Sequence, residues 1–169
     1  MQPRNLRLLI SHRAGDEGTD YLAELRSLAR AANVDLSPVG GRFAECRRQA
    51  GTANERFGLQ DAYSCADFVT YPSRVEGFGN AFLEAVFYHR PLLVNRYPVY
   101  VADIEPCGFD VVSIDGAITD PTVANVRRLL TDPKRRAQMT DHNYAVASRH
   151  FSYQTARRCL EEILASFDV

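Results

Sequence analysis

Residues 70–95 read T-Y-P-S-R-V-E-G-F-G-N-A-F-L-E-A-V-F-Y-H-R-P-L-L-V-N, and this stretch decides the fold. It predicts the end of a strand, a loop containing Gly77 and Gly79, a helix that starts near Gly79, and the next strand. Glu76 and Glu84 stand eight residues apart, which is a little over two helical turns. We therefore expect Glu76 in the loop before the helix and Glu84 inside the helix.

The loop before this helix has the features of an anion site. The first backbone N–H groups of a helix have no partner inside the helix and attract phosphate. Glycines allow the backbone to come close to a ligand. Carboxylates accept hydrogen bonds from hydroxyl groups, which a nucleotide sugar carries on both sides of its diphosphate. The pattern therefore favours a nucleotide sugar as the ligand.

Short apolar runs alternate with helical patterns over most of the chain. Strands are expected at 6–11, 34–39, 67–71, 91–95 and 110–114, and helices at 19–32, 59–65, 80–88, 121–130, 133–149 and 153–167. This alternation predicts a doubly wound, mainly parallel sheet, which is a Rossmann-like α/β fold. Because ligands of such sheets bind at the carboxyl ends of the strands, the following loops are expected to share one edge: those after Ile10, Val39, Tyr71 and Asn95.

Three local details complete this pattern. Thr19 or Asp20 is expected to cap the first helix, and Ser152 the last one. A helical turn is expected at 100–104. Residues 42–56 show no clear periodicity and are interpreted as a surface excursion, with or without a short helix.

The composition is that of a single domain with a hydrophobic core. The chain has 169 residues, 46% of them hydrophobic, and a net charge of −1, which gives no basis for binding nucleic acid. No apolar run approaches the ~20 residues of a membrane span, and no signal-peptide pattern is present. The four cysteines are far apart, as expected for reduced cysteines of a cytoplasmic protein: Cys46, Cys65, Cys107 and Cys159.

The central stretch resembles the E-x7-E region of retaining glycosyltransferase family 4, in the C-terminal, nucleotide-sugar-binding half of a GT-B fold. The matching residues are Glu76-Gly77-Phe78-Gly79, Leu83-Glu84-Ala85 and Pro91. The run 59–67 and the strand exit 71–73 also resemble the family, and the similarity extends from about Leu6 to the C-terminus. The resemblance implies an enzyme that transfers a sugar from a nucleotide to an acceptor hydroxyl with retention at the anomeric carbon.

The resemblance also implies roles for individual residues. Glu76 would be catalytic and lie at the transferred sugar, and Glu84 would hold the ribose hydroxyls. Main-chain N–H groups near the sugar and the diphosphate would come from Gly77, Phe78, Gly79 and Asn80. The donor would be linked to UDP, GDP or ADP, and the site would need neither a metal ion nor another cofactor. Helix dipoles and cationic side chains would stabilise the leaving diphosphate.

The sequence departs from the family pattern in its cations. The family takes an arginine and a lysine from a G-R-x4-K segment after the first strand of this domain, and no such segment is found. The only lysine, Lys134, lies far along the chain, and His12-Arg13-Ala14-Gly15 lacks the spacing. We therefore interpret residues 1–169 as one donor-binding domain of a longer enzyme. In this interpretation the chain lacks the N-terminal acceptor domain of that enzyme. We expect it to be inactive alone but able to bind a nucleotide.

Three further positions are open to two interpretations. His89 is a core or surface histidine, or else a residue of the pocket. Arg96 and Tyr97 either pack their loop or contact an acceptor or the other domain. The loops 69–73 and 95–100 are expected to be neighbours. The last helix has one broad apolar side, which is expected to pack on its own sheet; the alternative is that part of it is exposed and drives self-association.

Two other functions compete with the glycosyltransferase interpretation. The first is a non-catalytic module that binds a nucleotide or a phospho-sugar, which the missing cationic pair favours if the chain is complete. The second is a sugar phosphorylase or a nucleotide-sugar epimerase. These would need a basic phosphate site or a separate acid–base set, and neither is visible in the sequence.

Overall fold

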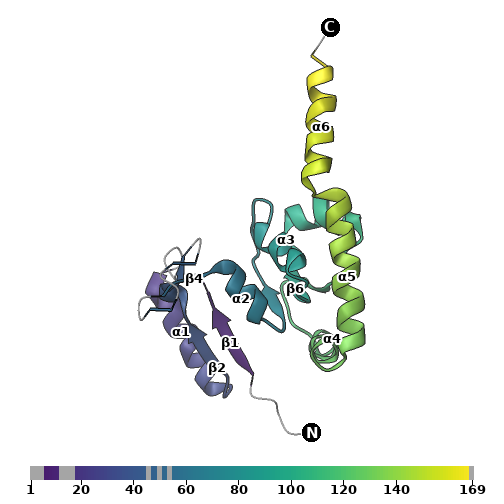
Figure 1. Ribbon diagram of the computed structural model, residues 1–169. Coiled ribbons are helices and arrows are strands. Elements are labelled where there is room, and N and C mark those ends of the chain that lie inside the picture. Colours follow the sequence, from purple (N-terminus) through teal and green to yellow (C-terminus); the bar gives the residue numbers. More distant parts are fainter. Residues whose placement is uncertain (1–5, 12–17, 45–46, 49–50, 53–54, 168–169) are drawn as a thin grey trace. The chain divides into compact units, whose positions relative to one another are not determined.

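The computed structural model describes residues 6–11, 18–44, 47–48, 51–52 and 55–167. The chain divides into two compact units, Met1–Ser64 (unit 1) and Cys65–Val169 (unit 2). Figure 1 shows both units as helices beside strands. Every pair of named strands in either unit is parallel. The expected α/β class with a mainly parallel arrangement is therefore observed.

Unit 1 begins with a strand–helix–strand segment. Strand β1 (Arg7–Ile10) pairs with β2 (Asp35–Pro38), and helix α1 (Gly18–Ala31) connects them. The helix ends where Asn33 adopts a positive φ of 53° and Val34 N–H bonds to Ala29. Both strands lie where the sequence predicts them. The predicted cap is wrong, because α1 already includes Thr19 and Asp20; residues 12–17 lie outside the described residues.

The segment without periodicity forms very short strands. A 3-10 turn covers Gly40–Arg42, and β3 (Phe43–Ala44) pairs with β4 (Phe57–Gly58). An isolated antiparallel bridge joins Arg48 and Arg56. The described part of 43–56 contains no helix. Helix α2 (Leu59–Cys65) follows at the predicted position and ends at the boundary between the units.

Unit 2 is built on a sheet with the strand order β5-β6-β7. These strands are β5 (Val69–Tyr71), β6 (Leu92–Asn95) and β7 (Val112–Ile114). Helix α3 (Asn80–Phe87) connects β5 to β6, and a π-helical turn (Tyr100–Ile104) followed by a 3-10 turn (Glu105–Cys107) leads towards β7. All four residues of β6 are buried, as expected for the central strand of a parallel sheet.

Three helices follow the sheet: α4 (Asp120–Thr131), α5 (Pro133–His150) and α6 (Tyr153–Ala165). Thr119, Asp132 and Ser152 cap them by accepting backbone N–H groups, so the predicted cap at Ser152 is confirmed. Helix α4 packs against β7, and α5 packs against α3 and α4.

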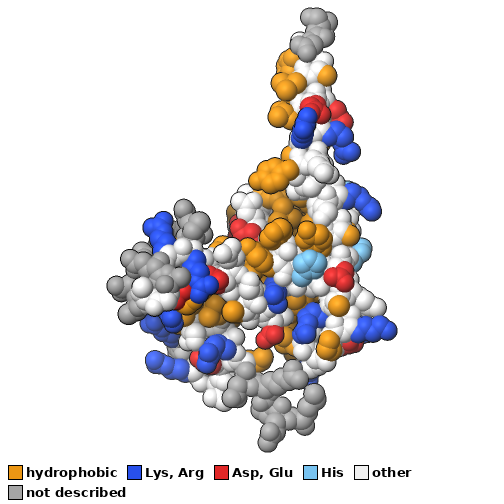
Figure 2. Space-filling view, in the orientation of Figure 1, with side chains coloured by type: hydrophobic (Ala, Val, Ile, Leu, Met, Phe, Trp, Pro, Cys, Tyr) orange, Lys and Arg blue, Asp and Glu red, His pale blue; other side chains and the backbone are white. Residues whose placement is uncertain are grey.

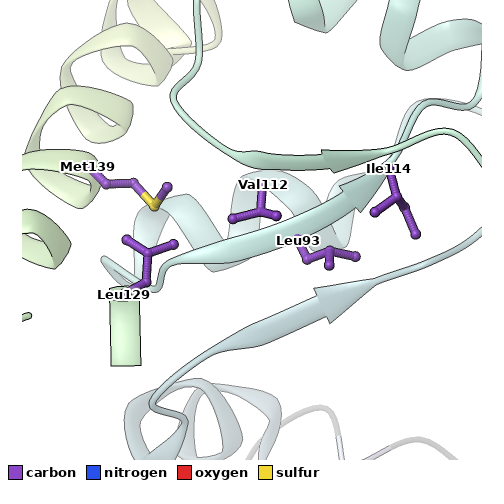
Figure 3. Close-up of a cluster of buried hydrophobic side chains, with 5 residues drawn as sticks. All are labelled: Leu93, Val112, Ile114, Leu129 and Met139. Atoms are coloured by element: carbon purple, nitrogen blue, oxygen red, sulfur yellow. The ribbon is translucent and has the colours of Figure 1, made fainter. Parts of the chain in front are cut away.

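The core of unit 2 lies between the sheet and these helices. Figure 3 shows the cluster formed by Leu93, Val112, Ile114, Leu129 and Met139, which come from β6, β7, α4 and α5. A second group of buried side chains includes Phe82, Ala85 and Val86 of α3. The helix and strand that flank the candidate site, α3 and β6, are therefore among the most fully buried elements of the described chain.

Helix α6 differs from the prediction. Its apolar side, which was expected to pack on the sheet, is exposed at Leu160, Ile163 and Leu164. Figure 2 shows hydrophobic side chains along one side of this helix. Among the described residues, we find no helix with the length and apolarity needed to cross a membrane.

Candidate functional site

The carboxyl ends of the three strands of unit 2 are joined by one buried side chain. Asn95 ends β6 and is only 5% exposed. Its Nδ2 donates to the carbonyl of Ser73 (3.1 Å), and its Oδ1 accepts from the N–H of Gly116 (2.8 Å). Asn95 thus holds the loops that follow β5 and β7 against the end of the central strand. Two of the four loops expected at one edge, those after Tyr71 and Asn95, meet there; the other two belong to unit 1, and their position stays a prediction.

The N-terminus of α3 lies after the β5 loop and has no side-chain cap. Gly79 is the N-cap residue, with φ +103° and ψ 55°, which is the left-handed region that glycine tolerates. Its carbonyl accepts the N–H of Phe82 (2.9 Å), so the helix begins there. No side chain accepts a hydrogen bond as a cap of α3. The first turn of this helix therefore offers the setting for an anion that its sequence predicts.

Tyr97 lies directly behind this loop. Its hydroxyl donates to the carbonyl of Phe78 (2.9 Å), and the residue is only 1% exposed. The Tyr71 ring contacts it edge-on, with centroids 6.0 Å apart. The loops 69–73 and 95–100 are therefore neighbours, as predicted. Burial raises the pKa of Tyr97, and the negative charge of Glu76 raises it further, so the phenol remains a donor at neutral pH.

The ring of Phe78 belongs to an aromatic cluster. It contacts Phe151 edge-on (5.6 Å), Phe151 stacks on Phe109 (6.1 Å), and Phe109 contacts Phe82 of α3 (5.0 Å). Phe151 follows the end of α5, so the cluster attaches the loop to the helical layer. Because the ring is used for packing and the carbonyl accepts from Tyr97, the main-chain N–H of Phe78 is the part available to a ligand.

The structure places the two glutamates as the spacing predicts. Glu76 lies in the loop before α3, Glu84 lies inside α3, and both are half-buried. Gly77 and Asn80 are exposed next to them. The six predicted site residues thus follow one another along the loop and the first turns of α3. Their individual roles towards a ligand stay predictions.

Two arginines near this edge, Arg96 and Arg74, differ in whether they form an ion pair with a described residue. Arg96 donates two hydrogen bonds to Glu105 (2.9 and 2.8 Å), and Glu105 thereby raises the pKa of Arg96. Arg74, in the loop before Glu76, is exposed and forms no ion pair with another described residue. The contacts of Arg96 with Glu105 lie within its own loop, whereas Tyr97 also bonds Phe78 of the neighbouring loop; a contact of either residue with an acceptor or another domain stays a prediction. Among the described residues, no group of three or more His, Cys, Asp or Glu side chains could hold a metal ion.

His89 lies at the other end of the strands. It has a positive φ of 51°, stacks on Tyr144 (4.6 Å between centroids), and its Nδ1 is 3.5 Å from Asp141. It lines a hollow of about 290 Å³ with Arg90, Pro91 and others. Because Pro91 directly precedes β6, this hollow is at the amino end of that strand. His89 is therefore a surface residue away from the candidate site.

Two residues of the site were not predicted as such. These residues are Asn95 and Tyr97. Asn95 makes one hydrogen bond to each neighbouring loop, and Tyr97 makes one to the loop that contains Gly77 and Gly79. For Asn95 the available signal was a polar residue at the end of an otherwise apolar strand, at the edge where ligands of parallel sheets bind.

Two curated proteins and solved structures are similar to this chain. No protein-family model matches the chain. It is 34% identical over 162 residues to mannosylglucosylglycerate synthase of Thermotoga maritima, covering 88% of this chain and 35% of that protein. It is 45% identical over 98 residues to the protein of that name from Petrotoga mobilis, covering 58% of this chain and 22% of that protein. The chain thus spans about a third or less of these curated relatives.

Solved structures share the fold. The chain resembles HepE of Anabaena, solved in complex with UDP, with a TM-score of 0.72 and 16% identity over 98% of this chain and 42% of that chain. It also resembles WaaG, described as a glycosyltransferase of lipopolysaccharide biosynthesis, with a TM-score of 0.54 and 16% identity over 91% of this chain and 36% of that one. The expected Rossmann-like α/β fold is thereby confirmed.

Proposed function

We propose that this chain binds the nucleoside diphosphate of a sugar donor and that the protein carrying it is a glycosyltransferase. The observation that carries the proposal is the start of α3. Gly79 opens the helix without a side-chain cap, two half-buried glutamates flank it, and the site lies at the carboxyl edge of a parallel sheet. The names of the two curated relatives and the UDP bound to HepE support the same class of reaction and ligand.

In this proposal the main chain stabilises the leaving group. The bond between the anomeric carbon and the diphosphate oxygen breaks, and the diphosphate takes its electron pair. The N–H groups at residues 77–80, with the positive end of the α3 dipole, stabilise the developing negative charge. Glu76 orients the transferred sugar, and Glu84 accepts hydrogen bonds from the ribose hydroxyls. The acceptor oxygen forms the new bond to the anomeric carbon on the face that the diphosphate leaves, so the configuration is retained, and its proton passes to the leaving diphosphate oxygen; the proposal needs no metal ion.

The substrate proposal rests on the relatives' names. A mannosylglucosylglycerate synthase makes a product that contains mannose, glucose and glycerate. We propose a mannosyl donor linked to UDP, GDP or ADP, and glucosylglycerate as the acceptor. Because the chain spans at most 35% of these relatives, we also propose that the acceptor site lies in another part of the protein. Residues 1–169 would then bind the nucleotide without transferring the sugar, in the cytoplasm.

Calorimetric titration with UDP, GDP and ADP tests the binding. The wild-type chain should bind one of the three, and Glu84→Ala should weaken that binding roughly tenfold or more, because hydrogen bonds to a charged group are lost. The matched control is Glu24→Ala, an exposed glutamate in α1, which should leave the affinity unchanged. No binding by a wild-type chain that melts cooperatively would contradict the proposal.

A second experiment separates an enzyme from a binding module. The full protein is incubated with mannosyl donors and glucosylglycerate, and the anomeric configuration of the product is read by NMR. Transfer with retention, lost in Glu76→Gln while nucleotide binding persists, is the expected result. Nucleotide binding without transfer by the full protein would favour the non-catalytic module instead.

A further inference from the structure

We propose that Tyr97 is a positioning residue of the donor site, which fixes the glycine-bearing loop 77–79 against the end of β6. The inference rests on the proposed function, because the loop is the part of that site that would face the diphosphate. Tyr97 itself lies behind the loop and touches no reacting atom. Tyr97 would determine the direction in which the backbone N–H groups of the loop point.

The hydrogen bond from Tyr97 is the only side-chain hydrogen bond from another element that the described structure shows to residues 77–79. The donor is a phenol that is 1% exposed, and the acceptor is the Phe78 carbonyl at 2.9 Å. Because the phenol is buried, losing this bond would leave a polar group without its partner. The bond therefore favours one position of the loop over its alternatives.

Gly79 and Tyr97 fit each other sterically. A Cβ atom added to Gly79 would overlap the hydroxyl of Tyr97, and its next neighbours would be Cζ of Tyr97 (3.3 Å) and Cε1 of Tyr71 (3.5 Å). The backbone of the loop thus lies directly on the phenol. By contrast, a Cβ at Gly77 would meet nothing within 4 Å. Only the second glycine of the loop is matched to the tyrosine.

Tyr97 is itself held firmly enough to act as a support. Its backbone N–H donates to the Asn95 carbonyl (2.9 Å), and its carbonyl accepts the N–H of Val101 (3.1 Å). Its ring lies between Tyr71, at 6.0 Å, and Tyr100, at 5.8 Å. Preorganised dipoles stabilise a developing charge without having to reorient during the reaction, so a rigid support is an advantage at this position.

The charge of Glu76 acts on the same phenol. After burial, the Glu76 carboxylate is the second cause of the raised pKa of Tyr97, and Glu76 stands two residues before Phe78 in the same loop. A shift of the loop away from Tyr97 would also displace Glu76. The tyrosine therefore connects the position of the N–H groups to that of the proposed catalytic carboxylate.

The test compares Tyr97→Phe with Tyr100→Phe. Tyr100 is a matched control because it is equally buried and packs on Tyr97 and Phe82, but its hydroxyl is not bonded to Phe78. Each variant is titrated with the diphosphate that the wild type binds, UDP, GDP or ADP, and with the corresponding monophosphate. Tyr97→Phe should raise the Kd for the diphosphate roughly 3- to 10-fold and that for the monophosphate less than 2-fold. Tyr100→Phe should leave the ratio of the two constants unchanged.

Amide hydrogen exchange without ligand gives an independent readout. Exchange at Phe82, whose N–H is bonded to the Gly79 carbonyl, should be roughly tenfold faster in Tyr97→Phe than in Tyr100→Phe at equal melting temperature. Equal weakening of both nucleotides, no weakening, or equal exchange in the two variants would overturn the inference while the proposed function stands. A wild type that binds none of UDP, GDP and ADP would overturn the proposed function, and with it the donor role of Tyr97.

Discussion

Gly79 occupies a backbone position that other residues adopt only at a cost. Its φ is +103°, and the hydroxyl of Tyr97 fills the space of the missing side chain. We predict that Gly79→Ala lowers the free energy of unfolding by at least about 2 kcal/mol, because left-handed strain and a steric overlap add up. Urea unfolding measures this difference, and Gly77→Ala serves as the control.

The double variant Gly79→Ala/Tyr97→Phe separates the two causes. Removing the hydroxyl relieves the overlap but leaves the backbone strain, so the double variant should recover part of the lost stability. A Gly79→Ala variant within about 0.5 kcal/mol of the wild type would contradict the assigned geometry.

Glu105 gives a pH-dependent contribution at the same edge. The hydrogen bond from Arg96 lowers its pKa below the ordinary 4.5, so the folded state binds the proton more weakly than the unfolded state. The stabilisation is therefore present above about pH 4.5 and is lost as the pH falls through the lower, folded pKa. Both side chains are more than a third exposed, so we expect only about 0.5 kcal/mol.

The measurement is urea unfolding of the wild type and Glu105→Gln between pH 3 and 6. The two stability curves should converge at the acid end, where the wild-type carboxyl is also neutral. A difference that stays constant over this range would show that the ion pair does not contribute.

Single residues also show where sequence reasoning stops. The spacing of Glu76 and Glu84 was enough to place one before α3 and one inside it. The hydrogen bond from the Tyr97 hydroxyl to the Phe78 carbonyl joins residues 19 positions apart. No periodic pattern in the sequence predicts it. From the sequence, Tyr97 could either pack its loop or contact an acceptor or the other domain. An aromatic residue after the strand is compatible with both roles.

At the scale of elements, one asparagine attaches α5 to the sheet. Asn143 is 1% exposed; its Oδ1 accepts the Asp110 N–H and its Nδ2 donates to the Asp110 carbonyl, both at 2.7 Å. Arg135 of the same helix bonds the Asp110 carboxylate at 2.8 and 2.7 Å. These bonds fix the segment that enters β7 and hence the edge where Gly116 follows it.

We predict that Asn143→Ala destabilises the chain by about 2–4 kcal/mol, because it leaves two part-buried backbone groups of Asp110 unpaired. Thermal and urea unfolding measure the loss. Gln138→Ala, an exposed change in the same helix, should stay within about 0.5 kcal/mol. An Asn143→Ala variant as stable as this control would show that water replaces the amide.

Element boundaries were less predictable than element types. The sequence suggested a strand from Asp67, whereas β5 begins at Val69. Pairing sets the boundary: Val69 is opposite Leu92 of β6, while the carbonyl of Ala66 is taken by the Arg90 side chain (3.0 Å). Helix starts were predicted more closely where a capping residue or a proline marked them, as at Pro133 and Ser152.

For the whole molecule, alternation of strands and helices was sufficient for the fold class. It could not predict which apolar faces become covered, because that depends on tertiary contacts. Helix α6 illustrates this: its amphipathic pattern suggested packing on the sheet, yet Leu160, Ile163 and Leu164 are more than half exposed. The pattern indicates an apolar face but does not say what covers it.

The two units differ in how many hydrophobic side chains they bury. Every buried hydrophobic side chain of the described residues lies between Phe82 and Val146, within unit 2. In unit 1 the buried residues among those described are Gly40 and Gly58. Because burial of apolar surface is the main favourable contribution to folding, unit 2 should supply most of the stability.

We therefore predict that unit 1 opens before unit 2. In native-state hydrogen exchange of the whole chain, the amides of β6 should be the slowest, and those of α1 and β2 should exchange at least roughly a hundredfold faster. Brief proteolysis should accumulate a product that begins near Cys65, which mass spectrometry identifies. Val94→Ala, inside β6, should accelerate exchange in unit 2 by creating a buried cavity, whereas Leu28→Ala, at an exposed position of α1, should not. Equal protection of the two units, or loss of unit 2 first, would mean that contacts beyond the buried core of unit 2 hold the chain together.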